Sequence, residues 1–173
     1  MNRAILLFAA AILVHPLFAQ DRESLIGGSP PELAGEGARW FPSDSAPRLA
    51  DLHGRVVYVQ FGLTSCAACQ SARAGLARWV ETFGQRGFVA IEVFDGRADG
   101  EWSVEEATRG RPWTALLDAG GRACLAWGVR SFPTAVLIDV EGKVVWQGSP
   151  LSRPADLEAS IERELDRVDG DPH

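Results

Sequence analysis

Two cysteines, at positions 66 and 69, are the residues in this sequence with the clearest capacity for chemistry. An apolar run over 56–61 predicts a buried strand just before them. After Cys69 the apolar residues take the spacing of a helix stripe, at Leu76, Trp79, Val80 and Phe83. Cys66 is therefore expected where a strand passes into a helix N-terminus. The partial positive charge at such a terminus stabilises the thiolate, the nucleophilic form of cysteine, and lowers its pKa.

The Cys-x-x-Cys spacing alone leaves other interpretations open. The pair is compatible with a redox-inert structural disulfide or with half of a zinc site. Structural zinc needs four ligands, and the sequence offers neither a second Cys-x-x-Cys nor a His pair. Copper is disfavoured because Met1 is the only methionine, and His15 and His173 lie near the two ends of the chain. The sequence predicts no metal site and no cofactor.

The composition restricts the classes of partner. The chain has 173 residues, a formal net charge of −6 and a pI near 5.1. Nucleic-acid recognition begins from a basic surface, and binding to anionic lipid needs clustered Lys and Arg, so both are disfavoured. A 46% hydrophobic fraction and six Trp are enough for the core of one domain of ordinary size.

The N-terminus has the pattern of a targeting segment. Asn2-Arg3 is followed by an apolar run over 4–14, and a small residue at Ala19 precedes the expected cleavage point, so residues 1–19 are predicted to be a signal peptide. The run is shorter than the about 20 residues of a membrane span. Leu17 stands where a small residue is usual, so an uncleaved N-terminal membrane tether remains the alternative. Export would place the protein where disulfides persist.

Three cysteines in an exported chain leave one to explain. Cys124 lies in a segment expected to be a short helix. One interpretation is a small buried apolar residue, and the other is a third redox thiol.

The rest of the chain divides into a linker over 20–37, a folded domain over 38–168 and a tail over 169–173. Strands are expected over 38–41, 55–62, 88–94, 113–118, 134–138 and 143–147. Helices are expected from the cysteine turn to about 83, and over 101–108, 122–127 and 154–168. A right-handed crossover makes the first two long strands parallel, and the last two strands form a hairpin. The expected fold class is α/β, with a mixed central sheet and helices on both faces.

These segments resemble the thioredoxin superfamily, and with the leader they look most like its extracytoplasmic TlpA/ResA-like members. The matching segments are Val57-Tyr58-Val59-Gln60-Phe61 through Cys69, then Gly128-Val129-Arg130-Ser131-Phe132-Pro133-Thr134, then Leu137-Ile138-Asp139 with Glu141-Gly142-Lys143-Val144. The resemblance implies a thioredoxin-like three-layer sandwich. It also implies thiol–disulfide exchange through a redox-active Cys66–Cys69 disulfide, in which Cys66 attacks and Cys69 resolves the mixed disulfide.

The resemblance assigns a second part of the site to Pro133. In the family this proline follows a cis peptide bond and faces the active-site cysteines, where it keeps metal from the thiols. The Phe132 backbone would then be free to pair with an extended substrate segment. From the residues alone, Pro133 could equally be a trans proline at the start of a strand.

The chain departs from the family pattern at three positions near the cysteines. Ser65 replaces the Trp that precedes the first Cys in cytosolic thioredoxins, and Gln60 replaces their buried Asp. Ala72 stands where some reducing extracytoplasmic relatives have Glu. Glu92, on the second long strand, is the nearest acid by position. It is either a buried proton carrier or a surface residue on a strand face.

The resemblance implies a protein-disulfide oxidoreductase acting outside the cytosol, in the bacterial periplasm, as a reductase. Its partners would be protein disulfides and a membrane thiol-electron donor, with no nucleic acid. The alternative is a thioredoxin-fold module that binds extended peptide beside Pro133 and keeps Cys66–Cys69 as a static disulfide.

Overall fold

The computed structural model describes residues 24–33, 35–42 and 47–170. The strands are β1 (Arg39–Phe41), β2 (Val56–Gly62), β3 (Phe88–Asp95), β4 (Thr114–Asp118), β5 (Thr134–Ile138) and β6 (Val144–Gly148). The helices are α1 (Ala67–Phe83), α2 (Glu101–Thr108), α3 (Arg122–Ala126) and α4 (Pro154–Asp169). Short 3₁₀ turns cover Leu49–Leu52, Gly84–Arg86 and Ala119–Gly121. Each predicted strand and helix is present, with bounds that differ by a few residues at most.

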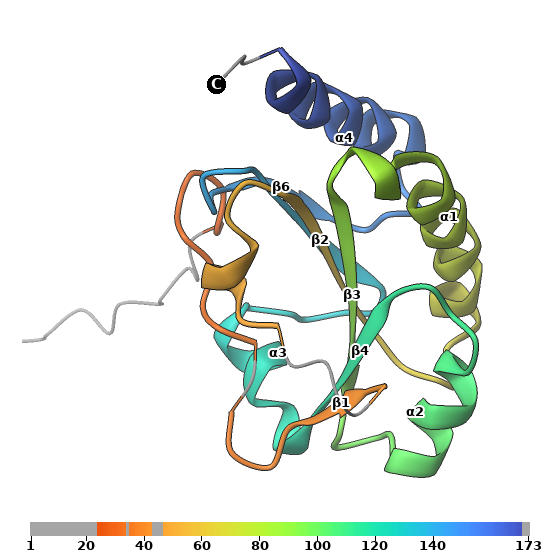
Figure 1. Cartoon of the computed structure of the whole chain (residues 1–173). Helices are drawn as coiled ribbons and strands as arrows, with labels where there is room; N and C mark the ends of the chain where they lie inside the picture. Colours follow the sequence, from red (N-terminus) through yellow and green to blue (C-terminus); the bar gives the residue numbers. More distant parts are fainter. Residues whose placement is uncertain (1–23, 34, 43–46, 171–173) are drawn as a thin grey trace, which may run out of the picture.

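The strands form one mixed sheet in the order β1-β4-β3-β2-β5-β6 (Figure 1). β2, β3 and β4 are parallel, as expected for strands joined by helical crossovers, whereas β1, β5 and β6 run antiparallel to their neighbours. The three parallel strands end at the same edge of the sheet. The loops that follow them, including the cysteine turn after β2, therefore meet at that edge.

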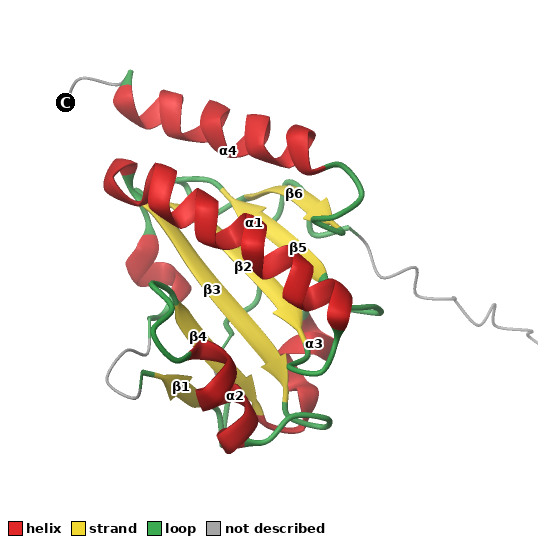
Figure 2. Cartoon of the chain, turned by 90° about the vertical axis from the view of Figure 1, so that its right-hand side faces the viewer, coloured by secondary structure: helices red, strands yellow, loops and turns green. Residues whose placement is uncertain are grey.

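Side chains of alternate residues point to opposite faces of the sheet, and each face carries its own core. On one face Tyr58 of β2 and Leu137 of β5 pack with Trp79 of α1 and Ile161 of α4. On the other face Val59 of β2 packs with residues of and next to α3. α1 and α4 lie across the near face in Figure 2, and α3 lies behind the sheet. This confirms the predicted α/β fold with helices on both faces.

The segment over 20–37, predicted as a linker, is bound to the domain where the structure describes it. The N–H of Gly27 donates to the carbonyl of Val144 at 2.8 Å, and the N–H of Val144 donates to the carbonyl of Gly28 at 2.9 Å. Leu33 is 3% exposed and belongs to the core on the α3 side of the sheet. The Gly and Pro content of this segment is typical of a linker. Two backbone hydrogen bonds nevertheless fix it to β6, and Leu33 anchors it in the core.

The predicted signal peptide at 1–19 lies outside the described residues, as does the end of the predicted tail, 171–173. Within the described ranges, no helix combines the length and the hydrophobicity that crossing a bilayer requires.

The packing of α4 predicts a large effect of one substitution. Ile161 is fully buried against the sheet, so Ile161→Ala should lower the free energy of unfolding by about 2–5 kcal/mol. Its neighbour Glu162 is exposed, and Glu162→Ala should change the value by less than about 0.5 kcal/mol. Urea denaturation of both variants checks this, and similar values for the two would contradict the packing of α4 described here.

Candidate active site

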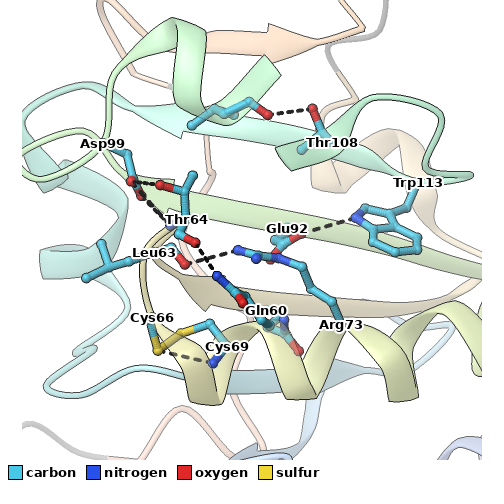
Figure 3. Close-up of polar contacts among 12 residues, drawn as sticks. Gln60, Leu63, Thr64, Cys66, Cys69, Arg73, Glu92, Asp99, Thr108 and Trp113 are labelled. Atoms are coloured by element: carbon cyan, nitrogen blue, oxygen red, sulfur yellow. Dashed lines mark hydrogen bonds and ion pairs between the residues drawn. A yellow bond between two sulfur atoms is a disulfide. The ribbon is translucent and has the colours of Figure 1, made fainter. Parts of the chain in front are cut away.

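Cys66 and Cys69 form a disulfide at the start of α1, with 5.2 Å between their Cα atoms (Figure 3). Cys66 is the N-cap residue of α1, and its Sγ accepts a hydrogen bond from the backbone N–H of Cys69 at 3.1 Å. Cys66 is half-buried, whereas Cys69 is completely buried. Cys66 is therefore accessible from outside the protein, whereas Cys69 is not.

The placement of Cys66 favours its thiolate. The first N–H groups of α1 have no partner within the helix, and together they carry the positive end of the helix dipole. The N–H of Cys69 already points at the Cys66 sulfur, and the same N–H would stabilise a negative charge on that sulfur after reduction.

The turn that leads to Cys66 is held by side chains from two sides (Figure 3). From α1, Arg73 Nη2 donates to the carbonyl of Leu63 at 3.1 Å, and Gln70 Nε2 donates to the carbonyl of Thr64 at 3.0 Å. From the loop after β3, the Asp99 carboxylate accepts hydrogen bonds from both the N–H and the hydroxyl of Thr64. Two consecutive residues of the turn are thereby fixed.

Gly62, the last residue of β2, separates Cys69 from the acid of β3. A Cβ at this position would lie 3.4 Å from both Cβ and Sγ of Cys69 and 3.9 Å from Glu92 Oε1. Cys69 Sγ and the Glu92 carboxylate are thus both within 4 Å of one point beside the strand. The glycine leaves the space between them free of a side chain.

Glu92 is fully buried, so the alternative that placed it on the surface is wrong. Its Oε1 accepts a hydrogen bond from Arg73 Nε at 2.6 Å, and its Oε2 accepts one from Trp113 Nε1 at 3.3 Å. Arg73 is itself only 5% exposed, which makes this a buried ion pair. Burial raises the pKa of the Glu92 carboxyl, and the Arg73 guanidinium opposes that rise without cancelling it.

Gln60 and Tyr58 complete the polar cluster under α1. The Tyr58 hydroxyl donates to Gln60 Oε1 at 2.9 Å, and burial raises the pKa of Tyr58 well above its usual value. Gln60 is directly opposite Glu92 in the sheet register. The Gln60 side chain lowers the pKa of the Glu92 carboxyl. The geometry between Gln60 Nε2 and that carboxylate nevertheless falls short of a full hydrogen bond. Gln60 takes no proton itself, so Glu92 is the titratable acid of the cluster.

The peptide bond between Phe132 and Pro133 is cis, as the resemblance implies. Pro133 comes directly before β5, which pairs antiparallel with β2 so that Thr134 lies opposite Phe61. Continuing this register by one residue sets Pro133 beside Gly62, at the end of β2 from which the cysteine turn leaves. Pro133 is buried and Phe132 is half-buried.

Cys124 is a buried free thiol, away from the disulfide on the α3 side of the sheet. Burial, with a further contribution from nearby Asp118, raises the pKa of Cys124 to about 12. Asp118 also accepts hydrogen bonds from the N–H groups of Ala123 and Cys124, which fixes the start of α3. Cys124 is thus the small buried residue of the first interpretation. Among the described residues, no group of three or more His, Cys, Asp or Glu side chains is arranged to hold a metal ion.

Sequence reasoning missed Arg73 and Asp99. An arginine on a helix, such as Arg73, is ordinarily interpreted as a surface residue. One signal was available. Side chains alternate between the two faces of a strand, and Gln60 and Glu92 fall on the face that α1 covers. A charge at Glu92 therefore needs a cation from that helix. Nothing local marks Asp99, because its partner Thr64 is 35 residues away in the sequence.

The buried ion pair predicts a pH-dependent loss of stability in the variant Arg73→Met. Removing one partner of a buried pair costs about 3–5 kcal/mol, because the other charge remains uncompensated. The pKa of Glu92, already raised by burial, would rise further in the folded state without Arg73, so the loss of stability should be large at about pH 8 and shrink as the pH falls toward about 5. Urea denaturation across this pH range measures it.

The double variant Arg73→Met, Glu92→Gln is the control for that measurement. It has no buried charge, so it should recover most of the stability and show little of the added pH dependence. If the effects of the two substitutions simply add, the two side chains do not form the pair described here.

No protein-family model and no curated protein sequence matches the chain. Solved structures do match. A structure from Chlorobium tepidum, solved as a candidate thiol:disulfide interchange protein DsbE, has 25% identity and a TM-score of 0.65, with 79% of this chain and 95% of the other covered.

Two further structures share the fold at 22% identity. The thioredoxin domain of a thiol-disulfide oxidoreductase from Bacteroides vulgatus has a TM-score of 0.68, with 81% of this chain and 97% of the other covered. An exposed lipoprotein thioredoxin from Streptococcus pneumoniae has a TM-score of 0.63, with 77% and 98% covered. The fold, the Cys66–Cys69 disulfide and these similar structures place the chain in the thioredoxin superfamily, beside its DsbE/ResA-like thiol-disulfide oxidoreductases.

Proposed function

We propose that this protein reduces protein disulfides outside the cytosol, with Cys66 as the nucleophile and Cys69 as the resolving cysteine. The observation that carries the proposal is the asymmetry of the pair. Cys66 is partly accessible at the N-terminus of α1, whereas Cys69 is completely buried behind it. A disulfide with only a structural task needs no such difference between its two sulfurs.

The reaction begins with the reduced protein, in which both cysteines are thiols. The Cys66 thiolate attacks one sulfur of the substrate disulfide; a mixed disulfide forms, and the other substrate sulfur leaves as a thiolate. Cys69 then loses its proton and attacks Cys66 Sγ. The second substrate sulfur leaves, and the Cys66–Cys69 disulfide is formed with two electrons transferred to the substrate.

Glu92 is the proposed acceptor of the Cys69 proton. Cys69 is buried and depends on a base within the protein, and the Glu92 carboxylate is beside Gly62 on the same side as Cys69 Sγ. A raised pKa makes Glu92 a better proton acceptor than an exposed carboxylate. Arg73 keeps the carboxylate oriented through Oε1 at 2.6 Å.

The substrate is proposed to bind beside the cis-proline. The register between β2 and β5 sets Pro133 next to the end of β2, and Phe132, which precedes it, is partly exposed. The backbone of Phe132 would pair with an extended segment of the substrate protein, which brings its disulfide to Cys66. Such pairing is sequence-tolerant, because main-chain groups supply the hydrogen bonds.

A reductase in an oxidising compartment must be reduced again after each turnover, so we propose a membrane thiol-electron donor as its partner. The N-terminal pattern at 1–19 supports a signal peptide that directs the protein to the periplasm, or a tether if it is not cleaved. The similar DsbE-type and exposed lipoprotein thioredoxin structures also support an extracytoplasmic place. No cofactor is proposed beyond the disulfide itself.

The assignment of the two cysteines predicts distinct phenotypes. In an assay of insulin disulfide reduction, Cys66→Ser should abolish activity, whereas Cys69→Ser should attack once and remain bound to substrate as a mixed disulfide detectable by mass spectrometry. Cys124→Ala should leave the rate unchanged, because its buried thiol takes no part. If the wild-type protein shows no reductase activity, the proposal is wrong, and the alternative of a peptide-binding module with a static disulfide takes its place.

The role of Glu92 predicts a defect in the second step alone. The variants to compare are Arg73→Met and Arg73→Met, Glu92→Gln, which differ only in the carboxylate. At about neutral pH, the double variant should resolve the mixed disulfide roughly 10²-fold more slowly. The difference should close as the pH rises through the pKa of Cys69, since a thiolate needs no base. Equal rates at every pH up to the pKa of Cys69 would exclude Glu92 as the acceptor.

A further inference from the structure

Asp99 makes the most extensive side-chain contact with the turn that presents Cys66. It is on the loop between β3 and α2, and it is 9% exposed. The N–H of Thr64 lies 3.2 Å from Asp99 Oδ1 and 3.1 Å from Oδ2, and the Thr64 hydroxyl donates to Oδ1 at 2.5 Å. Figure 3 shows these contacts on the side of the turn opposite α1.

The loop that carries Asp99 is itself fixed. The N–H groups of Ala98 and Asp99 donate to the carbonyl of Asp95, at 3.0 Å and 2.9 Å. Asp95 also accepts hydrogen bonds from Arg97. The backbone of Asp99 is therefore fixed to the end of β3. Its carboxylate in turn fixes Thr64 relative to this edge of the sheet.

The position of Thr64 in the chain gives this contact its consequence. Thr64 precedes Cys66 by two residues, and the N–H of Cys66 lies 3.4 Å from the carbonyl of Leu63. In the oxidised protein the disulfide also holds Cys66 against α1. After reduction that covalent link is absent, and the turn is held by hydrogen bonds alone.

We propose that Asp99 is a positioning residue for thiol–disulfide exchange: through Thr64 it keeps Cys66 at the N-terminus of α1 while the protein is reduced. The inference rests on the proposed function of Cys66 and adds a residue to it. Asp99 touches neither sulfur in this arrangement. It acts through the turn, and its effect is on the reduced state, because the disulfide replaces it in the oxidised state.

Positioning and charge have opposite effects on Cys66, which makes the two separable. Asp99 is negative, so its charge alone disfavours a thiolate on Cys66, as does that of Glu92, whereas Arg73 and the N-terminus of α1 favour it. Removing the Asp99 charge would therefore lower the pKa of Cys66. Releasing the turn would move Cys66 away from the N–H groups of α1 and raise that pKa toward the ordinary value of about 8.5.

The experiment compares four variants of the reduced protein: Asp99→Ala, Asp99→Asn, Thr64→Val and Thr64→Ser. The pKa of Cys66 is measured from the pH dependence of its alkylation by iodoacetamide, followed at that residue by mass spectrometry. Cys124, with a pKa of about 12, does not interfere. Asp99→Ala should raise the Cys66 pKa, and each unit of increase reduces the thiolate fraction at neutral pH about tenfold.

The other variants calibrate that result. Thr64→Val loses only the hydroxyl bond and should raise the Cys66 pKa by less than Asp99→Ala does. Thr64→Ser keeps both donors, and Asp99→Asn keeps an acceptor oxygen, so neither should raise it. The oxidised forms of all four should show melting temperatures closer to wild type than the reduced forms do.

Two outcomes would overturn the inference. A Cys66 pKa in a folded but less stable Asp99→Ala protein that is no higher than in Asp99→Asn, which lacks the same charge, would make Asp99 a purely structural residue. A lowered pKa would show that its charge, not its hydrogen bonds, acts on Cys66. Failure of the wild type to reduce insulin would refute the proposed function instead, and the alkylation series would still report on the contact between Asp99 and Thr64.

Discussion

The buried ion pair between Arg73 and Glu92 is the interaction on which the arrangement of the site depends. A carboxylate buried beneath α1 requires a cation and hydrogen-bond donors within reach. Arg73 meets this demand from α1 through Nε, and its Nη2 reaches the turn that carries Cys66. One side chain thus couples the helix that begins at the cysteines, the strand that supplies the acid and the loop between β2 and α1. Movement of α1 relative to the sheet would break both of these hydrogen bonds together.

In the proposed mechanism the buried acid beside the resolving cysteine is Glu92, which lies on β3 and not on β2. Gln60 is neutral and serves as a hydrogen-bonding neighbour, and the acid is across the sheet register at Glu92. The open space beside Cys69 comes from Gly62, where a Cβ would lie 3.4 Å from Cys69 Sγ. Ala72 supplies no acid to this cluster; the next residue on α1, Arg73, supplies its cation.

The sequence was sufficient to predict what depends on local pattern. The order of elements, the hairpin of β5 and β6, and the place of Cys66 at a helix start follow from periodicity and turn residues; the cis bond before Pro133 followed from family resemblance. Contacts between distant segments did not follow. The burial of Glu92 was left open because one strand residue does not reveal which helix covers it. Arg73 and Asp99 were missed because a buried charge is recognisable only together with its partner, and both partners are remote in sequence.

The backbone hydrogen bonds between Gly27-Gly28 and Val144 have a consequence for the behaviour of the protein in a crowded compartment. β6 is the last strand of the sheet on its side, and a free outer strand offers unpaired N–H and C=O groups to any extended chain. Here the N–H and C=O of Val144 are already taken by the protein's own N-terminal segment. A protein whose proposed substrates are themselves extended polypeptides gains from this protection. Under the proposed function, a second extended chain would find the Val144 end of β6 already paired while the first is bound beside the cis-proline.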